Sequence, residues 1–255
     1  MHNAAFAALG MAWRYELFPA QPERLAEEVT RLVAEGVRGF NVTIPHKRAV
    51  LALSQVRERS AAVEAIGAAN TLTVLSAEPP VLRAENTDWR GFLDDLRAHD
   101  LDPRGKVCVV LGTGGSARAI GYALGRAGAT AITYISRTPT RANYLGTVRD
   151  YAALSELTPR ADLIVNCTPL GMWPHVERSP WPADVPFPPH AALYDLVYNP
   201  PTTQLMRQAR AVGARAVGGL GMLVRQGALA FAQWTGRTPP LDVMMQAART
   251  ALEGK

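Results

Sequence analysis

The 255-residue chain has little cysteine and no long apolar run, and both shortages exclude classes of protein. Cys108 and Cys167 lie within apolar stretches, where they suit two reduced, buried side chains better than a disulfide framework. No apolar run approaches the roughly 20 residues that a membrane-spanning helix needs, and the first residues lack the basic-then-apolar layout of a signal peptide. We therefore expect a cytoplasmic protein with no membrane partner.

Lysine is also scarce, and the basic residues are not clustered. Charged residues make up 19% of the chain and hydrophobic residues 48%, an ordinary globular composition. The formal net charge of +5 comes from scattered arginines without aromatic interleaving, so we expect a small anionic ligand and no nucleic acid. The only lysines are Lys47, Lys106 and Lys255. Because ammonium and guanidinium differ in proton-transfer chemistry, an amine at position 47 suggests a function there.

Apolar periodicity in the first third of the chain predicts strands and helices in alternation. Such alternation favours a mostly parallel sheet with helices on its faces. The pattern predicts helices over 3–9 and 22–34, a helical stretch over 46–66, and strands over 14–18, 39–43, 71–75 and 81–84.

A second α/β domain follows the turn-rich segment at 102–105, after a bridging helix over 89–99. Its strands are near-continuous apolar runs, as expected when helices cover both faces of a sheet. We expect strands over 106–111, 130–135, 162–166 and 192–197, helices over 115–127, 138–146 and 241–252, a further helix from the glycines at 218–221 to residue 231, and a proline-rich loop over 174–189.

A glycine-rich turn directly follows the strand over 106–111 and directly precedes a predicted helix, the context that a dinucleotide-binding turn requires. Gly112 permits the tight turn, Gly114 lets the backbone approach a pyrophosphate, and Ala117 is small enough for close helix packing. Helix N-terminal amides would face the phosphates. The alternative is a tight strand-to-helix turn without a ligand, but the context favours a Rossmann-type nucleotide-binding domain.

The end of the next strand indicates which dinucleotide is bound. NAD enzymes usually carry an acidic residue at this position, whereas NADP enzymes carry a cation. Residues 136–141 contain no carboxylate, and Arg137, Arg141 and the Thr138 hydroxyl could bind a 2′-phosphate. An exposed basic helix start would look similar. After the glycine turn, however, the segment favours NADP.

Lys47 and Asp88 are the predicted pair for proton transfer. Taken separately, Lys47 could be a solvated side chain and Asp88 a cap for the following helix. Taken together, a nearby carboxylate favours the ammonium form of the lysine, which can donate a proton to the alkoxide that develops when a ketone is reduced. The pair therefore indicates a reductase that uses NADPH.

Ordered motifs along the whole chain resemble the shikimate dehydrogenase family. This resemblance implies reversible, NADP-linked reduction of 3-dehydroshikimate to shikimate in aromatic amino acid (chorismate) biosynthesis. It also implies a substrate domain formed by 1–88 and 236–255 and a Rossmann domain formed by 89–235, with the last helix packed back on the substrate domain. The motifs are NVTIPHK at 41–47, GAANTL at 67–72, ENTDWRGF at 85–92, LGTGGSAR at 111–118, SRTPTRA at 136–142, NCTPLGM at 166–172, YDLVYNP at 194–200 and GLGMLVRQG at 219–227.

The resemblance also assigns roles to residues, each with a simpler alternative. Asn70 could be a turn residue, Tyr198 a half-buried aromatic and Gln226 an exposed helix position. We expect His2 and His46 to be structural or surface groups. The implied catalytic pair is Lys47 and Asp88; the implied substrate residues are Thr43, Asn70, Tyr198 and Gln226; the implied cofactor residues are Gly112, Gly114, Gly115, Ser116, Arg137, Thr138, Arg141, Thr168, Met172, Gly219 and Met222.

The chain departs from the family pattern at its first residue. Family members normally carry, before the stretch that begins here at Met1, a strand and a Ser-x-Ser loop whose hydroxyls bind the substrate carboxylate. Each such charge-assisted hydrogen bond contributes roughly 1.5 to 3 kcal/mol, so we expect weaker substrate binding and suspect a misassigned start codon or a shortened sequence. Two alternatives stay open: a quinate/shikimate enzyme that accepts NAD, and a catalytically silent NADP-binding protein. We expect a monomer or homodimer.

Overall fold

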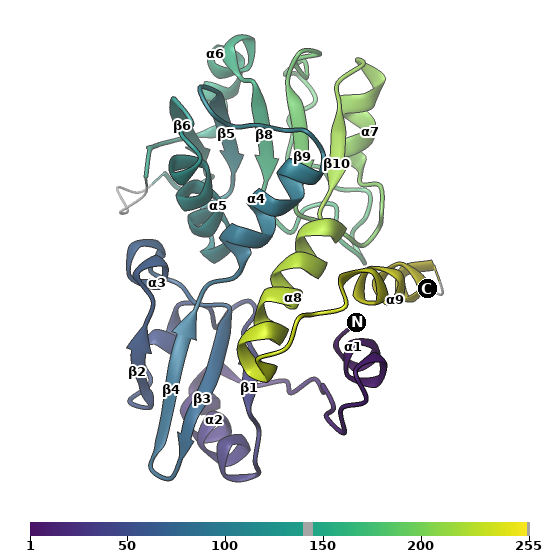
Figure 1. The fold of residues 1–255 in the computed structure, drawn as a ribbon. Coiled ribbons are helices and arrows are strands. Elements are labelled where there is room, and N and C mark those ends of the chain that lie inside the picture. The colour runs from purple at the N-terminus through teal and green to yellow at the C-terminus, as the bar shows by residue number, and fades with distance from the viewer. Residues whose placement is uncertain (140–144, 254–255) are drawn as a thin grey trace.

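The computed structural model of the chain describes residues 1–139 and 145–253 and has two α/β bodies, each built on its own sheet (Figure 1). The first sheet has the strand order β1-β3-β4-β2. One face is covered by α2 (Leu25–Ala34), whose Leu25, Val29 and Val33 are buried against the sheet. The strands are β1 (Gly39–Asn41), β2 (Val56–Arg59), β3 (Thr71–Ala77) and β4 (Pro80–Glu85).

The prediction of two α/β domains is confirmed, but the first sheet is not mostly parallel. β1 pairs with β3 and β3 with β4 in antiparallel register, and only β2 and β4 are parallel. The cause is local, because the two-residue connection between β3 and β4 closes a hairpin, and a hairpin is antiparallel by geometry.

The predicted strand over 14–18 is absent, and the segment is irregular. A strand needs a neighbouring strand to take its hydrogen bonds. Here the Tyr15 backbone N–H instead donates to Asn3 Oδ1 (2.6 Å), and the Tyr15 carbonyl accepts from Asn3 Nδ2 (3.0 Å). Leu17 remains 86% exposed. Apolar alternation alone therefore misled the prediction.

The predicted helical stretch over 46–66 is wrong in its middle. The 3-10 helix η2 (Ala49–Ala52) and α3 (Ala61–Ile66) flank β2. Ser60 ends the strand and caps α3, because its hydroxyl accepts the Val63 N–H (3.3 Å). One buried position in β2, Val56, is too weak a signal to mark an edge strand.

The second body is a six-stranded sheet of order β10-β9-β8-β5-β6-β7, and every pairing in it is parallel. The four predicted strands are present, and β7 and β10 are additional three-residue edge strands. The strands are β5 (Val107–Leu111), β6 (Ala131–Ile135), β7 (Thr147–Arg149), β8 (Leu163–Asn166), β9 (Ala192–Asp195) and β10 (Ala216–Gly218).

The 3-10 helices of the described chain are η1 (Pro22–Arg24), η2, η3 (Tyr151–Ala153) and η4 (Thr158–Arg160).

Helices and a loop cover both faces of this sheet. One face packs against α4 (Asp88–Ala98) and α5 (Gly115–Arg126), and the other against α6 (Leu154–Leu157), α7 (Gln204–Ala211) and the proline-rich loop. The prediction missed α6 and α7. The predicted helix over 138–146 is not helical at 138–139 or 145–146, and its remainder lies outside the described residues.

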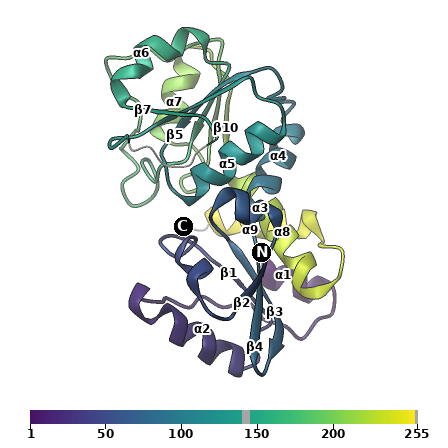
Figure 2. The same ribbon diagram turned by 90° about the vertical axis from the view of Figure 1, so that its left-hand side faces the viewer.

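Two packed helices join the bodies, which lie one above the other in Figure 2. α4 leads from β4 into the second body, and α8 (Leu220–Thr235) returns, with Trp234 Nε1 donating to the Leu72 carbonyl in β3 (3.1 Å). Gly91 allows the crossing, because a Cβ there would lie 2.7 Å from the Gln226 backbone nitrogen. The crossing brings residues from both halves of the sequence to the junction.

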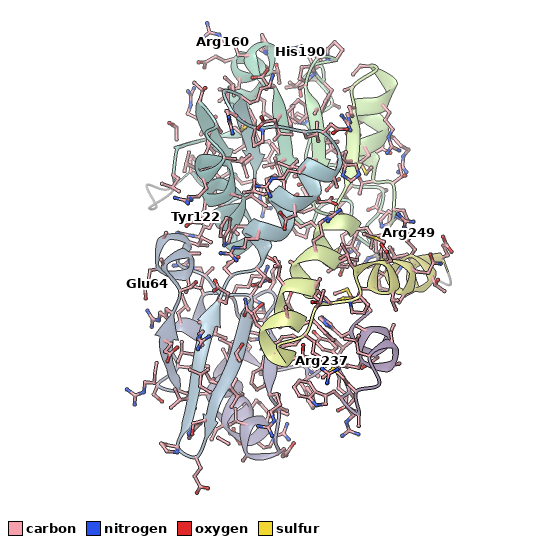
Figure 3. All side chains as sticks on the ribbon, viewed as in Figure 1. Glu64, Tyr122, Arg160, His190, Arg237 and Arg249 are labelled. Atoms are coloured by element: carbon pink, nitrogen blue, oxygen red, sulfur yellow. The ribbon has the colours of Figure 1, made fainter. Side chains whose placement is uncertain are left out.

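The last helix, α9 (Leu241–Glu253), packs on α8 and on α1 (His2–Ala8) through a cluster that includes Phe6, Phe231 and Met244. Beside the junction, Tyr122 of α5 lies above α3 (Figure 3) and meets the Trp89 ring edge-on, with centroids 5.3 Å apart. No helix in the described part of the chain is long and apolar enough to cross a bilayer.

Candidate active site

Lys47 lies in a turn after β1 whose backbone is well anchored. The Lys47 carbonyl accepts the Ala69 N–H (2.8 Å), and the His46 N–H donates to the Thr43 carbonyl (2.8 Å). The His46 ring donates from Nε2 to the Ala20 carbonyl (2.9 Å), a structural contact. These bonds fix the direction in which the Lys47 side chain leaves the turn, towards α4.

Lys47 and Asp88 form a close, largely buried ion pair. The Lys47 Nζ lies 2.6 Å from Asp88 Oδ2, and the side chains are 13% and 7% exposed. Asp88 is the first residue of α4, whose N-cap is Thr87, and among the described residues no side chain makes a capping hydrogen bond there. The Asp88 carboxylate is thereby available to the lysine. Charge-assisted bonds of this length are among the stronger polar contacts in proteins.

An amide network holds the other side of the carboxylate. Asn70 Nδ2 donates to Asp88 Oδ1 (2.8 Å) and to Gln226 Oε1 (3.1 Å), while Asn70 Oδ1 accepts the Thr87 N–H (2.7 Å). The Thr87 hydroxyl also reaches Gln226 Oε1 (3.3 Å). The network around Asp88 thus joins Asn70, directly before β3, Thr87, directly before α4, and Gln226 on α8. Asn70 is buried, and Gln226 is partly buried and accepts a hydrogen bond from Asn70. Gln226 is therefore not an exposed helix position.

The glycine turn of the second body lies against the same lysine. Lys47 Nζ donates to Ser116 Oγ (3.2 Å), and a Cβ on Gly115 would lie 3.3 Å from Lys47 Cβ. Gly112 has φ +103°, a conformation that side chains rarely adopt. In the described part of the chain no side chain caps the start of α5, so its first backbone N–H groups are available to an anion. The turn therefore fits a pyrophosphate.

The end of β6 adjoins this turn, because the Gly112 N–H donates to the Ile135 carbonyl (2.8 Å). The Thr138 N–H donates to Ser136 Oγ (3.2 Å), and the Arg137 and Thr138 side chains are exposed. Arg141 lies outside the described residues. The described part of this segment carries a cation and a hydroxyl and no carboxylate, which fits a 2′-phosphate.

Two buried polar residues at the ends of neighbouring strands hold the loop after β8. The Thr168 hydroxyl donates to Asn166 Oδ1 (2.7 Å), and Asn166 Nδ2 donates to Asp195 Oδ1 (2.8 Å). Burial raises the pKa of Asp195, and the Thr203 hydroxyl, 2.6 Å away, opposes that rise. A Cβ on Gly112 would lie 3.2 Å from Thr168 Cγ2, so the held loop packs on the glycine turn.

The sequence prediction missed Asn166 and Asp195 as site residues. A signal was present, because ligands of parallel α/β sheets bind at the carboxyl ends of the strands, where both residues lie. Burial raises the pKa of the Cys108 thiol to about 12 and that of the Cys167 thiol well above its usual value, so neither thiol is ionised near neutral pH.

Three predicted residues stand apart from the network around Asp88. Within residues 1–139 and 145–253, no hydrogen bond joins the side chains of Thr43, Met172 or Tyr198 to Lys47, Asp88, Asn70 or Gln226. All three are exposed. Tyr198 and Gly219 line a separate cavity, and Gly219 caps α8 tightly, with a Cβ there meeting the Leu196 carbonyl oxygen at 2.2 Å. Met222, in the first turn of α8, is buried.

The fold and the network together define a class of protein. A Rossmann-type sheet presents a glycine turn, and a lysine–aspartate pair from another α/β body lies against that turn. This is the arrangement of a pyridine-nucleotide-dependent oxidoreductase, in which a proton donor faces the site of hydride transfer.

Comparison with known proteins identifies the family. Models of the shikimate dehydrogenase substrate binding domain and the shikimate 5'-dehydrogenase C-terminal domain match residues 1–72 and 219–249. The NADP(+) shikimate dehydrogenase of Moorella thermoacetica is 43% identical over 266 residues, covering 99% of this chain and 88% of the relative. The NADP(+) shikimate dehydrogenase of Symbiobacterium thermophilum is 41% identical over 273 residues, covering 100% of this chain and 90% of the relative.

Solved structures agree. Shikimate 5-dehydrogenase from Thermus thermophilus, in complex with NADP(H) and shikimate, matches with a TM-score of 0.86 and 37% identity, covering 98% of this chain and 93% of that chain. The chain belongs to the shikimate dehydrogenase family, so the resemblance drawn from its motifs is confirmed.

Proposed function

We propose that this chain is an NADP-dependent shikimate dehydrogenase that reversibly reduces 3-dehydroshikimate to shikimate in aromatic amino acid biosynthesis. The observation that carries the proposal is the buried Lys47–Asp88 pair, 2.6 Å apart, lying against Ser116 of the glycine turn. A proton donor and a dinucleotide turn within hydrogen-bond distance of each other are what ketone reduction needs. The names of the close relatives support the same reaction.

Lys47 is the proton donor in the proposed reaction. NADPH, when bound, supplies a hydride to the carbonyl carbon, and the carbonyl oxygen then gains the electron pair of the C=O bond. The Lys47 ammonium donates a proton to that oxygen and gives the alcohol. Asp88 binds Nζ and fixes its direction, and in the reverse reaction Lys47 accepts the proton from the alcohol.

The amide network fits a polyhydroxylated substrate. Asn70 and Gln226 each carry a donor and an acceptor, and Asn70 bonds directly to Asp88. We assign substrate binding to these two residues and, on the family pattern, to Thr43 and Tyr198. Such groups favour a substrate with several hydroxyls, because an analogue that lacks one leaves a buried polar group unpaired.

The second body supplies the residues that we assign to cofactor binding. Gly112, Gly114, Gly115 and Ser116 would receive the pyrophosphate at the start of α5. The 2′-phosphate would bind Arg137, Thr138 and Arg141, and the nicotinamide half would lie near Thr168, Met172, Gly219 and Met222.

The division into domains is part of the proposal. We assign 1–88 and 236–255 to the substrate domain and 89–235 to the NADP-binding domain, which is supported by the two separate sheets and by the packing of α9 on α1. A cytoplasmic location is supported by the two free cysteines, since reducing compartments keep thiols unpaired.

The purified chain tests the function directly. NAD(P)H formation is followed by absorbance with shikimate or quinate as substrate and NADP or NAD as cofactor. We expect turnover with shikimate and NADP and little with the other three combinations. Comparable rates with quinate or NAD would favour the broader quinate/shikimate enzyme. Tight NADPH binding in calorimetry without turnover in any combination would favour a silent NADP-binding protein.

A further inference from the structure

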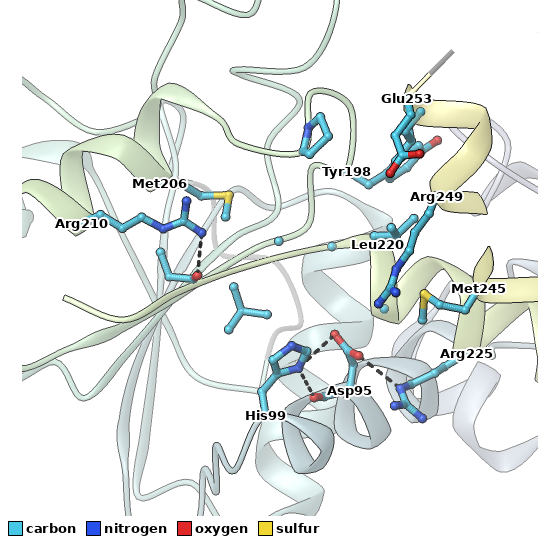
Figure 4. Close-up of a pocket in the computed structure, with 17 residues that line it drawn as sticks. Asp95, His99, Tyr198, Met206, Arg210, Leu220, Arg225, Met245, Arg249 and Glu253 are labelled. Atoms are coloured by element: carbon cyan, nitrogen blue, oxygen red, sulfur yellow. Dashed lines mark hydrogen bonds and ion pairs between the residues drawn. The ribbon is translucent and has the colours of Figure 1, made fainter. Parts of the chain in front are cut away.

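Asp95 is a buried carboxylate that the proposed reaction does not use. It lies seven residues after Asp88 on α4, about 10 Å along the helix axis, and is 1% exposed. Its Oδ2 accepts the Tyr194 hydroxyl (2.6 Å), and its Oδ1 accepts Arg225 Nε (3.1 Å). Figure 4 shows Asp95 between His99 and Arg225. Buried carboxylates are rare unless paired, and Arg225 is the ion-pair partner of this one.

The carboxylate reaches the backbone at the start of α8. A Cβ on Gly221 would lie 1.9 Å from Asp95 Oδ1, so only glycine allows the approach. The Tyr194 hydroxyl also interacts with the Met222 backbone N–H. Because a carboxylate can only accept hydrogen bonds, the Tyr194 proton is directed to Asp95 and the Tyr194 oxygen faces Met222. The first turn of a helix favours a nearby negative charge.

Packing around the start of α8 is incomplete. A cavity of about 500 Å³ adjoins residues 219–221, and it is lined by Asp95 and Arg225 as well as by residues of β10, α7 and α9 (Figure 4). Side chains that do not fill the space cannot fix the helix there. Met222 packs in the core of the second body, and the Gly219 N–H donates to the Val197 carbonyl (3.1 Å). To these contacts Asp95 adds its bond to Arg225 of α8 and its close approach to Gly221, on the side where the packing is incomplete.

The helix that Asp95 holds is the one that reaches the active site. Gln226 lies one turn after Met222 on α8, and its backbone packs on Gly91 of α4. Its Oε1 accepts from Asn70 Nδ2 (3.1 Å), which also binds Asp88 (2.8 Å). A shift of α8 along α4 would therefore displace Gln226 and Met222 relative to Asp88.

We propose that Asp95 is a positioning residue for hydride and proton transfer, which fixes the first turn of α8 against α4 and so keeps Met222 in place and Gln226 in the network around Asp88. This inference rests on the proposed function. Asp95 acts through α8 and touches neither substrate nor cofactor.

The test compares Asp95→Asn with the wild type. The amide keeps the volume but loses the charge and one acceptor. We expect kcat to fall about 10- to 100-fold, since a displacement near 1 Å can reduce a rate by that order. The NADPH dissociation constant from calorimetry should stay within about twofold, because the glycine turn and Arg137 are unchanged. The kinetic isotope effect on kcat with deuterated NADPH should rise, because misplacement slows hydride transfer; a loss of folded protein alone would not change it.

Two further variants sharpen the result. Asp94→Asn is the matched control, since Asp94 on the same helix has a side chain 42% exposed, pairs only with Arg97 in the described chain (2.6 Å) and should behave as the wild type. Tyr194→Phe is a milder change that keeps the ring and its edge-on contact with Phe92 (centroids 5.0 Å apart). It should lower kcat in the same direction but by less.

Backbone hydrogen exchange measures how firmly the start of α8 is held, and it needs no substrate. Backbone amides of 221–226 should exchange faster in Asp95→Asn and Tyr194→Phe than in the wild type and Asp94→Asn. Unchanged exchange, or an unchanged kcat and isotope effect in both variants, would overturn the positioning role. A wild-type chain that never turns over shikimate would instead contradict the proposed function, so the two failures are distinct.

Discussion

The buried imidazole of His2 makes the stability of the fold depend on pH. The ring is 3% exposed and stacks on Tyr15 with centroids 4.5 Å apart, and neither ring nitrogen makes a well-formed hydrogen bond with any described residue. Burial, aided by the positive amino terminus, lowers the His2 pKa from 6.5 to about 4, and the nearby Asn41 side chain opposes this only weakly. The folded chain therefore keeps His2 neutral where the unfolded chain protonates it.

The direction and size of this pH effect on stability follow from the difference in proton binding between the folded and unfolded chain. A depressed folded-state pKa means that stability is fully present above pH 6.5 and is lost as pH falls towards about 4, because the unfolded chain binds the proton first. At about 1.4 kcal/mol per pKa unit, the full loss is about 3 kcal/mol. About 2 kcal/mol of it falls between roughly pH 7.5 and pH 5.

Urea unfolding followed by tryptophan fluorescence at those two pH values measures the effect. His2→Phe keeps an aromatic ring and removes the titrating group, so its free energy of unfolding should fall by about 2 kcal/mol less than that of the wild type between the two conditions. His190→Phe, at an exposed position, is the control and should keep the wild-type pH dependence. Equal losses in wild type and His2→Phe would refute a neutral buried His2.

Two other predictions concern the second body. Replacing Arg137 and Arg141 together by Gln should raise the KM for NADP about 10- to 100-fold and leave the KM for NAD unchanged, because charge-assisted bonds to the 2′-phosphate are lost. Arg160→Gln, at an exposed position, is the control. An unchanged ratio of the two KM values in the double variant would count against the phosphate site. Gly121→Ala should lower the free energy of unfolding by about 1 to 3 kcal/mol, because its Cβ would lie 1.4 Å from Tyr134 Oη. On the same helix, a Cβ on Gly125 would meet only Leu145 Cδ1 among the residues that the structure describes, at 3.9 Å, so Gly125→Ala should stabilise instead. Equal effects of the two changes would refute the packing argument.

The second sheet was predictable because its strands carry their own signal. Strands covered on both faces are continuous apolar runs, as Val107–Leu111 is, and the glycine turn marks the following helix start. Edge strands such as β7 and β10 have three residues each and no such run. The segment at 14–18 shows the opposite error, since its alternation was real but no neighbouring strand takes its hydrogen bonds.

The catalytic pair was predictable only as a hypothesis from motifs, because Lys47 and Asp88 are 41 residues apart and their contact depends on the fold. Asp95 shows what was missed. The sequence places Asp94 and Asp95 side by side, yet Asp94 is only partly buried and Asp95 is fully buried. Helical spacing was the available signal, since Asp95 lies on the same face as Gly91 and Phe92. Its partner Tyr194, 99 residues away, could come only from the structure.

Loss of the amine at position 47 tests the central claim most directly. Lys47→Ala should reduce shikimate turnover by at least about 10²- to 10⁴-fold, the usual contribution of a general acid, with NADPH affinity in calorimetry nearly unchanged. Lys106→Ala removes an exposed amine 3.5 Å from Asp162 and should retain wild-type turnover. Retained turnover in Lys47→Ala, or parallel losses of turnover and NADPH affinity, would contradict proton transfer by Lys47.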